Sequence, residues 1–301
     1  MEFIFLVFTL ILPCFALDPL DFQIGNFTLE DNDYRLTEIE NDTDYIWDVG
    51  EAAGRIIGGT IATPNQFPYQ AGILLRLPKK RAWCGGSIIS VEYILTAAHC
   101  IDDALSATVI LGAHNRENDN EEGRISIETT PEDFILHEYW SPKRLEADIA
   151  LIHLKERITF SDQIQPILLP FSEYETQYFN NSLATVSGWG KHKSNCGKLP
   201  LHLRFYQSRI MHNSKCRRYY PQYVGLNHIC LEPKEKRRSC DGDSGGPLVV
   251  NIEQGHPMLV GVTSFGKCCG GSYPTVFTRV TQYLNWITQY TYRGRDGSIP
   301  L

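Results

Sequence analysis

The sequence lacks the compositional biases of several non-enzymatic protein classes. Its 301 residues are 43% hydrophobic and 21% charged, with 24 Gly and 16 Pro, which is not typical of a disordered, collagenous or multi-span membrane protein. It has no C-x-x-C...C-x-x-C or H-E-x-x-H pattern that would indicate a zinc site, and no usable internal repeat. A chain of this length can bury the core of one catalytic domain or of two small packed domains.

The first 16 residues form an apolar run that is short for a membrane span. The run ends in small residues, Cys14 and Ala16, at cleavage-site spacing, which is typical of a signal peptide cut after Ala16. The alternative is a signal anchor, which Pro13 and the absence of a following basic flank disfavour. We therefore expect a secreted, extracellular protein.

Export affects the interpretation of the nine cysteines, because thiols in the secretory pathway tend to be oxidised in pairs. Removal of Cys14 with the signal leaves eight cysteines, enough for four disulfides. Three N-x-S/T sequons fit the same compartment as candidate glycosylation sites. They lie at Asn26, Asn41 and Asn180.

The net charge of −7 is unevenly distributed along the chain. Residues 17–55 contain 11 acidic and 2 basic side chains, whereas residues 56–301 contain 23 acidic and 26 basic side chains. The acidic leader is low in apolar periodicity, so we expect it to be poorly folded alone, although it could lie against the basic body at low salt.

After residue 56 the pattern consists of short apolar runs separated by turn residues, which predicts antiparallel barrels or a sandwich. Such runs are residues 71–75, 108–111, 148–152, 247–250 and 258–262. One long helical pattern appears near the C-terminus. Its apolar stripe comprises Val280, Tyr283, Leu284, Ile287 and Tyr290.

The run Gly242-Asp243-Ser244-Gly245-Gly246-Pro247 has the composition of a nucleophile turn. Glycines on either side of a serine allow a tight turn that exposes the hydroxyl and aims consecutive N–H groups at one point. A serine hydroxyl also needs a base, held in the right tautomer by a buried carboxylate. His99 in Ala97-Ala98-His99-Cys100 and Asp148 in Asp148-Ile149-Ala150-Leu151 offer both groups.

Each of these residues has an ordinary structural interpretation when taken alone, as a core histidine, a turn aspartate or a glycine-rich loop. Their joint order His, Asp, Ser, however, is that of trypsin-like serine proteases, which the chain resembles from Ile56 to about Tyr290. Three further motifs support the resemblance: Arg55-Ile56-Ile57-Gly58-Gly59, Gly188-Trp189-Gly190 and Thr263-Ser264-Phe265-Gly266.

The resemblance implies an all-β, chymotrypsin-like fold with two six-stranded antiparallel β-barrels and a C-terminal α-helix. The expected organisation is a signal peptide over 1–16, an acidic activation propeptide over 17–55 and a serine protease domain over 56–301. Within that domain the first barrel covers about 56–165, the second about 166–280, and the helix and tail about 281–301.

The resemblance also implies a role for each residue of the site. His99 acts as general base toward Ser244, and Asp148 orients the imidazole. The N–H groups of Gly242 and Ser244 form the oxyanion hole, and Ser264 to Gly266 pair with the substrate backbone as an added strand.

Activation is expected to follow cleavage after Arg55 by a trypsin-like protease. The new amino group of Ile56 would turn inward and pair with Asp243, ordering the oxyanion loop. The leader from Leu17 to Arg55 contains no cysteine, so it should leave after the cut.

The chain departs from trypsin at the pocket that binds the substrate side chain. Arg238 stands where trypsin-type enzymes hold Asp, and Thr275 stands where large-pocket relatives commonly carry Gly, while Gly266 keeps one wall open. Cleavage after Lys or Arg is therefore not expected. Either Arg238 selects acidic residues, or it turns aside and leaves a shallow apolar pocket for small or medium side chains, which we favour because burial of an unpaired guanidinium is costly.

Two further departures bear on metals. Ala113-His114-Asn115 stands where calcium-binding relatives begin with Glu, and Pro274 stands where sodium-regulated relatives carry Tyr. We expect no essential metal and no cofactor.

For the disulfides, the resemblance implies three pairs: Cys84 with Cys100, Cys216 with Cys230, and Cys240 with Cys269. Cys196 and Cys268 are left, in loops that border each other in this fold, and we predict that they pair. Adjacent cysteines cannot be separated by spacing, so the alternative pairing is Cys240 with Cys268 and Cys196 with Cys269.

The expected partners are protein or peptide substrates, an activating trypsin-like protease and protein inhibitors of proteases. We expect no nucleic acid, no membrane after signal removal, and a monomer. The rival hypothesis is a non-catalytic protease homologue that binds or regulates. Such chains usually lack a triad residue, and this chain has all three.

Overall fold

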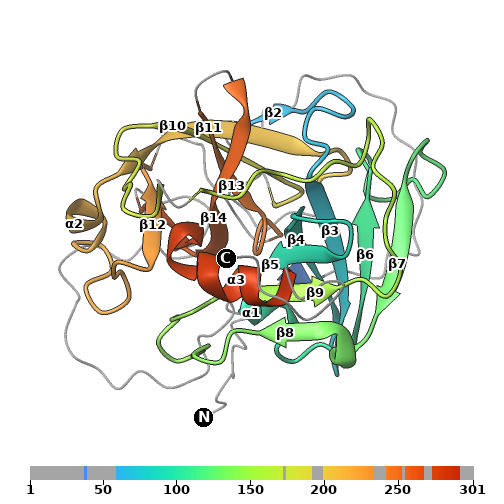
Figure 1. Cartoon of the computed structure of the whole chain (residues 1–301), viewed down its shortest axis with the longest axis horizontal. Helices are drawn as coiled ribbons and strands as arrows, with labels where there is room; N and C mark the ends of the chain where they lie inside the picture. The colour runs from blue at the N-terminus through green and yellow to red at the C-terminus, as the bar shows by residue number, and fades with distance from the viewer. Residues whose placement is uncertain are drawn as a thin grey trace, which may run out of the picture.

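The computed structural model describes residues 37–38, 59–171, 174–191, 199–233, 242–252, 255–267 and 273–291. These residues form two antiparallel sheets that lie side by side, with one helix across the front (Figure 1). No helix in these ranges is long and apolar enough to cross a membrane.

The first sheet runs in the order β7-β6-β3-β4-β5-β9-β8, and β1 pairs with β4 off this path. Ile73 and Leu75 of β3 are fully buried and pack with Val109 of the neighbouring β6 in one core. They lie two residues apart, so their side chains point to the same face of the sheet. The strands are β1 (Thr37–Glu38), β3 (Gln70–Arg76), β4 (Arg81–Ile88), β5 (Tyr93–Thr96), β6 (Ser106–Leu111), β7 (Ile125–Thr129), β8 (Phe134–Leu136) and β9 (Ala150–His153).

The second sheet runs in the order β10-β13-β14-β15-β12-β11-β2, and a further pairing of β10 with β11 closes six of its strands into a ring. Its interior is apolar, with Ile229, Leu248 and Phe277 fully buried. The strands are β2 (Thr60–Ile61), β10 (Leu183–Gly188), β11 (Arg204–Met211), β12 (His228–Leu231), β13 (Pro247–Asn251), β14 (Pro257–Phe265) and β15 (Thr275–Arg279).

The helices are short, and the last of them follows β15. They are α1 (Ala98–Ile101), η2 (Pro131–Asp133), α2 (Asn213–Cys216), η5 (Val280–Tyr283) and α3 (Leu284–Thr291). Tyr283, Trp286 and Ile287 belong to the core of the first sheet, and the Trp286 ring lies 5.1 Å from that of His137. The C-terminal helix therefore returns from the second half of the molecule to pack on the first (Figure 1).

The predicted fold class is confirmed. Both halves are antiparallel and barrel-like, and a helix covers the expected apolar stripe near the C-terminus, where Val280 and Ile287 are fully buried. The second half closes into a six-strand ring, whereas the described strands of the first half form an open path.

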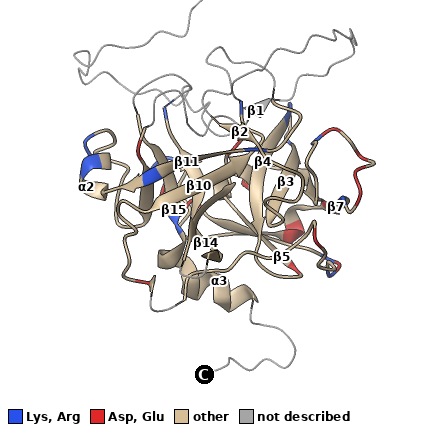
Figure 2. Cartoon of the chain, turned by 90° about the horizontal axis from the view of Figure 1, so that it is seen from above, with Lys and Arg blue, Asp and Glu red and all other residues tan. Residues whose placement is uncertain are grey.

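The two halves meet along β4 and the segments around residues 187–189 and 244–246. The Ser187 hydroxyl donates to Gln70 Oε1 at 2.7 Å, and the Trp83 and Trp189 rings lie edge to face with centroids 5.6 Å apart. Most Lys, Arg, Asp and Glu lie around the outside of the two sheets, with basic residues at α2 (Figure 2). The junction between the halves is closed by a buried hydrogen bond and by aromatic packing, and the residues predicted to be catalytic lie there.

Candidate active site

His99 and Asp148 form a buried pair at the junction. His99 Nδ1 lies 2.7 Å from Asp148 Oδ2, the backbone N–H of His99 donates to Asp148 Oδ1 at 3.0 Å, and each side chain is 1% exposed. The disulfide of Cys84 and Cys100, with an S–S distance of 2.04 Å, ties α1 to β4 beside the histidine. Since Asp148 occupies Nδ1, Nε2 is the imidazole nitrogen that can exchange a proton with another group.

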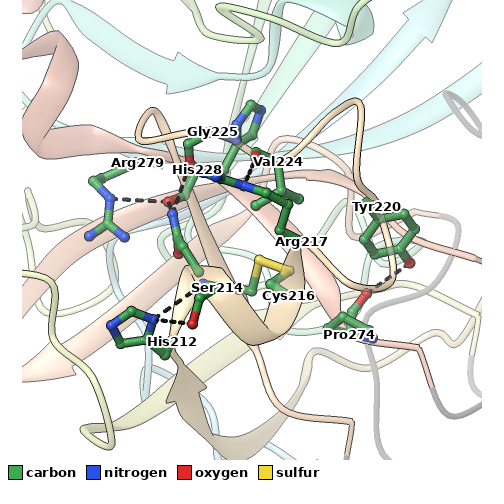
Figure 3. Close-up of a disulfide and its surroundings, with 12 residues drawn as sticks. His212, Ser214, Cys216, Arg217, Tyr220, Val224, Gly225, His228, Pro274 and Arg279 are labelled. Carbon is green, nitrogen blue, oxygen red and sulfur yellow. Dashed lines mark hydrogen bonds between the residues drawn. A yellow bond between two sulfur atoms is a disulfide. The ribbon is translucent and has the colours of Figure 1, made fainter.

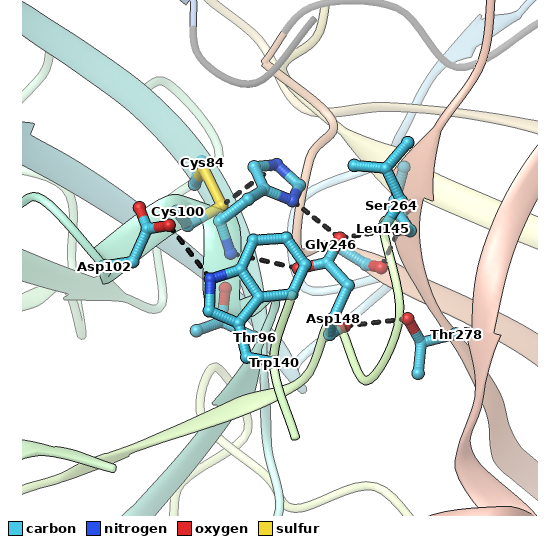
Figure 4. A network of polar contacts seen from close by, with 12 residues as sticks. Cys84, Thr96, Cys100, Asp102, Trp140, Leu145, Asp148, Gly246, Ser264 and Thr278 are labelled. Carbon is cyan, nitrogen blue, oxygen red and sulfur yellow. Dashed lines mark hydrogen bonds and ion pairs between the residues drawn. A yellow bond between two sulfur atoms is a disulfide. The ribbon is translucent and has the colours of Figure 1, made fainter. Parts of the chain in front are cut away.

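Asp148 has two more partners from the second half of the molecule (Figure 4). The Ser264 hydroxyl donates to Oδ2 at 2.5 Å, and the Thr278 hydroxyl donates to the backbone carbonyl at 2.7 Å. Burial by itself raises the pKa of Asp148, but the His99 imidazole and the hydrogen bonds from His99 and Ser264 outweigh it and lower the pKa below its usual value. The carboxylate is therefore ionised and held in one orientation.

Ser244 lies in a turn stabilised by backbone hydrogen bonds. The Gly245 N–H donates to the Thr263 carbonyl at 2.8 Å, and the Gly246 N–H donates to the Asp243 carbonyl at 2.9 Å. Gly242 and Gly245 have φ values of +94° and +75°, a backbone region that glycine adopts without steric cost. In the described part of the chain, the N–H groups of Gly242 and Ser244 have no acceptor, so they could bind an external oxygen atom.

The Ser244 turn packs directly on the segment that precedes His99. The Ser244 carbonyl accepts a hydrogen bond from Gly85 N–H at 2.7 Å, and a Cβ atom at Gly245 would overlap the Thr96 hydroxyl. Within the described residues no hydrogen bond joins the Ser244 hydroxyl to His99, whose Nε2 lies 3.8 Å from Cys100 Sγ. Catalytic hydrogen bonds are often long without substrate and tighten when it binds.

The two glycines of the Gly188-Trp189-Gly190 motif lie against the Asp243 side chain. The Gly190 N–H donates to Asp243 Oδ1 at 2.8 Å, and a Cβ atom at Gly190 would overlap the carboxylate. The Asp243 side chain is buried and borders a cavity that Gly59 also lines. Gly59 is three residues after Ile56, and three extended residues reach about 10 Å.

The segments predicted to form the specificity pocket face each other. A Cβ atom at Gly266 would lie 3.7 Å from Thr275 Cα and 3.8 Å from the Pro274 carbonyl oxygen. The Tyr220 hydroxyl joins the two segments, because it accepts from Lys267 N–H at 3.1 Å and donates to the Pro274 carbonyl at 3.0 Å. Ser264, Phe265 and Thr275 are each less than 10% exposed.

The loop between β6 and β7 contains a buried guanidinium in a ring of oxygen atoms. Arg124 Nη1 donates to the carbonyl oxygens of Asn115, Arg116 and Asn118 at 3.0, 3.2 and 3.0 Å. Nη2 donates to the Asp119 carboxylate at 2.7 Å, and the Arg124 side chain is 4% exposed. Backbone carbonyls and carboxylates are the ligands that Ca²⁺ prefers, and here the Arg124 guanidinium already occupies the ring of carbonyl oxygens.

The described residues hold one cluster with potential metal ligands, Cys84, His99 and Cys100. The two sulfur atoms are bonded to each other in the disulfide, whereas a cysteine binds a metal ion as the free thiolate. This cluster therefore does not fit a metal ion, and the absence of an essential metal stays a prediction.

A second disulfide joins Cys216 and Cys230, at an S–S distance of 2.06 Å, beside His228 and Arg279 (Figure 3).

Of the predicted glycosylation sites, Asn180 is exposed on the surface. The other predicted residues lie outside the described part of the chain: Asn26, Asn41, Arg55, Ile56, Cys196, Arg238, Cys240, Cys268 and Cys269.

Several residues of the site had no signal in the sequence. Thr278, Tyr220 and His228 contact the predicted site through hydroxyl or imidazole hydrogen bonds. Their partners in the site lie 47 to 130 residues away in the chain, so neither local periodicity nor a spaced motif could have identified them.

The chain is similar to known proteins over the region that forms these two sheets. The family model described as Trypsin matches residues 56–287. The collagenase of Hypoderma lineatum is 38% identical over 242 residues, which are 79% of this chain and 88% of the relative. Brachyurin of Leptuca pugilator is 37% identical over 238 residues, covering 78% of this chain and 98% of the relative.

A solved structure of HL collagenase agrees with this likeness in three dimensions. It superposes with a TM-score of 0.69 at 37% identity, covering 79% of this chain and 99% of the other.

Proposed function

Because this chain belongs to the trypsin family and is a serine endopeptidase, we propose that Ser244, His99 and Asp148 are its catalytic triad. The observation that supports this assignment most is the buried pair of His99 Nδ1 and Asp148 Oδ2, 2.7 Å apart, with the Ser264 hydroxyl on the same carboxylate oxygen. A buried carboxylate bound to Nδ1 keeps the imidazole in the tautomer in which Nε2 accepts a proton.

In the proposed reaction, the Ser244 hydroxyl attacks the carbonyl carbon of the scissile peptide bond while His99 Nε2 takes its proton. The imidazolium is stabilised by Asp148 and returns the proton to the leaving amine, which departs and leaves an acyl group on Ser244. Water, deprotonated by His99, then hydrolyses the ester and restores the serine.

The tetrahedral intermediate carries a negative oxygen, for which we assign the N–H groups of Gly242 and Ser244. Their lack of acceptors within the described residues supports this role. Loss of one such donor typically costs about 3 kcal/mol of transition-state stabilisation. Ser264 to Gly266 would hold the substrate backbone beside the triad as an added strand.

Activation by cleavage after Arg55 is part of the proposal. The cavity that Gly59 and Asp243 both line supports pairing of the freed Ile56 amino group with the Asp243 carboxylate, because Ile56 is three residues from Gly59 and three extended residues reach about 10 Å. The ion pair would fix the peptide units of Gly242 and Asp243, and thereby the oxyanion hole. A trypsin-like protease is the activator that Arg55 requires.

For substrate preference we propose small, medium apolar or acidic residues before the scissile bond. The approach of Thr275 to Gly266 supports a shallow pocket, and Arg238 disfavours basic side chains by charge repulsion. One relative is named a collagenase, which makes collagen a substrate to include in the assay. Secretion is supported by the two disulfides, which persist in oxidising compartments.

The decisive test is labelling by an organophosphate after limited trypsin treatment of the 301-residue chain. The cut protein should be labelled on Ser244 and should cleave peptides from a positional library, whereas Ser244→Ala should do neither. Ser208→Ala removes another buried serine and should behave like the wild type. A correctly cut chain without label would instead indicate a non-catalytic homologue.

A further inference from the structure

His228 lies in β12, directly opposite Thr278 of β15 in the sheet register. Directly opposed residues of an antiparallel pair point to the same face, and both side chains reach the segment that ends in Asp148. The Thr278 hydroxyl donates to the Asp148 carbonyl at 2.7 Å, and His228 Nε2 lies 3.2 Å from the Leu145 carbonyl oxygen. Two neighbouring side chains of the second half thus hold both ends of residues 145–148, which belong to the first half.

The tautomer of His228 follows from its two hydrogen bonds. Nδ1 accepts from the Gly225 N–H at 3.1 Å, so the ring proton is on Nε2 and is donated to the Leu145 carbonyl. His228 is 4% exposed. Burial lowers its pKa; the hydrogen bond to the Leu145 carbonyl and the carboxylates of Asp148 and Glu146 act in the opposite direction, and Arg279 adds to the lowering. The neutral ring that both hydrogen bonds require is therefore the favoured state.

The segment that His228 holds has an unfavourable backbone conformation. Leu145 and Ala147 have φ values of +51° and +53°, a left-handed region disfavoured for residues with a Cβ atom. The Ile149 N–H donates to the Ala147 carbonyl at 2.8 Å, which closes a tight turn around Asp148. Such conformations persist only when the surroundings impose them.

The backbone of His228 is held by hydrogen bonds from neighbouring side chains (Figure 3). Its carbonyl accepts from Asn213 Nδ2 at 2.9 Å and from Arg279 Nε at 3.1 Å. The Phe265 ring, next to Ser264, packs edge to face on the imidazole with centroids 5.8 Å apart. The donor that reaches Leu145 is consequently fixed in place by the same sheet that supplies Ser264.

We propose that His228 is a positioning residue for the triad: through the Leu145 carbonyl it holds residues 145–148 so that the Asp148 carboxylate stays aligned with His99. This inference rests on the proposed function of Asp148. It adds a residue that touches neither the substrate nor the reacting atoms.

Three variants of His228 distinguish the effect of losing the hydrogen bond to Leu145 from the effect of losing the volume of the imidazole ring. His228→Met provides a side chain of similar size that makes neither of the two hydrogen bonds. His228→Asn retains an acceptor for Gly225 and is too short to reach Leu145, whereas His228→Gln retains a donor at the length of Nε2. Ser208→Ala, which loses a partly buried hydrogen bond to the Glu232 carbonyl, is the matched control for stability.

With the trypsin-cut enzyme and a peptide amide substrate, His228→Met and His228→Asn should lower kcat by roughly 10- to 100-fold, the effect of a small misplacement of a catalytic group. KM should change less than kcat. The acid-limb pKa of kcat/KM should fall, because a displaced carboxylate stabilises the His99 imidazolium less. His228→Gln should recover most of kcat, and Ser208→Ala should change neither parameter.

The low-field proton signal of His99 Nδ1–H gives a readout that does not require turnover. It should shift or broaden in His228→Met and His228→Asn but not in Ser208→Ala. Unchanged kcat, acid limb and proton signal in folded His228→Asn would overturn the proposal, as would an equal loss in His228→Gln. Failure of organophosphate to label the wild type would count against the proposed function alone, since the proton signal still tests the positioning.

Discussion

Arg124 allows a quantitative prediction about the loop between β6 and β7. In Arg124→Met, three carbonyl oxygens that now accept from Nη1 at 3.0 to 3.2 Å lose their donor. Hydrogen bonds to a charged group contribute about 1.5–3 kcal/mol each, but water can reach part of an opened loop, so we expect a total loss of about 2–4 kcal/mol. The pair with Asp119, which is 85% exposed, contributes at most about 1 kcal/mol of this total.

The assay is thermal unfolding of the cut domain. In a domain of this size 1 kcal/mol corresponds to roughly 2–4 °C, so the Tm of Arg124→Met should fall by roughly 4–16 °C. Arg157→Met is the control, because Arg157 is 54% exposed in its pair with Glu92 and should cost less than about 1 kcal/mol.

The same assay tests whether the guanidinium takes the place of a metal ion. Neither EDTA nor added Ca²⁺ should change the Tm of the wild type, because Arg124 already occupies the carbonyl ring. A fall of several degrees in EDTA, or an Arg124→Met variant as stable as Arg157→Met, would refute the reasoning.

Three further predictions concern acid stability, the leader and the fourth disulfide. The pKa of Asp148 is lowered in the folded state, so the ionised carboxylate stabilises the fold above the unfolded pKa of about 3.9, and this stabilisation is lost as pH falls through the folded pKa. The free energy of unfolding in urea between pH 5 and 2 should therefore depend less steeply on pH in Asp148→Asn than in the wild type. After cleavage at Arg55 the leader should separate on a denaturing, non-reducing gel, and its retention would contradict the absence of a covalent tether. Peptide mapping without reduction should recover Cys196 linked to Cys268, whereas a peptide joining Cys196 to Cys269 would support the alternative pairing.

Local features of the sequence were sufficient for the elements that depend on short-range physics. The stripe with Tyr283 and Ile287 predicted the C-terminal helix, because a period of 3.6 residues places these side chains on one face. The glycines around Ser244 predicted a tight turn, since only a residue without Cβ adopts φ values such as +75° without strain. The order of His99, Asp148 and Ser244, with the motifs around them, predicted a protease because it resembles that of trypsin-like serine proteases.

Other features of the site depended on which strands lie side by side, and no local pattern encodes that. Ser264 reaches the Asp148 carboxylate across 116 residues, Thr278 reaches its carbonyl across 130, and His228 reaches Leu145 across 83. Each contact exists because β12, β14 and β15 are paired in one register, and a slip of one residue would turn these side chains to the opposite face.

The sequence alone thus determined the chemistry of this protein: a serine, a histidine and a carboxylate in protease order, on short strands with a terminal helix. The tertiary structure decided what keeps that chemistry aligned. Burial of Asp148 costs free energy unless several donors reach it. His99, in the same half of the molecule, supplies two of them, and Ser264 supplies a third from the other half. The contacts of the Arg124 guanidinium were likewise decided by the tertiary structure. Its partners are mostly backbone carbonyls, which every residue carries, so no pattern of side chains in the sequence marks them.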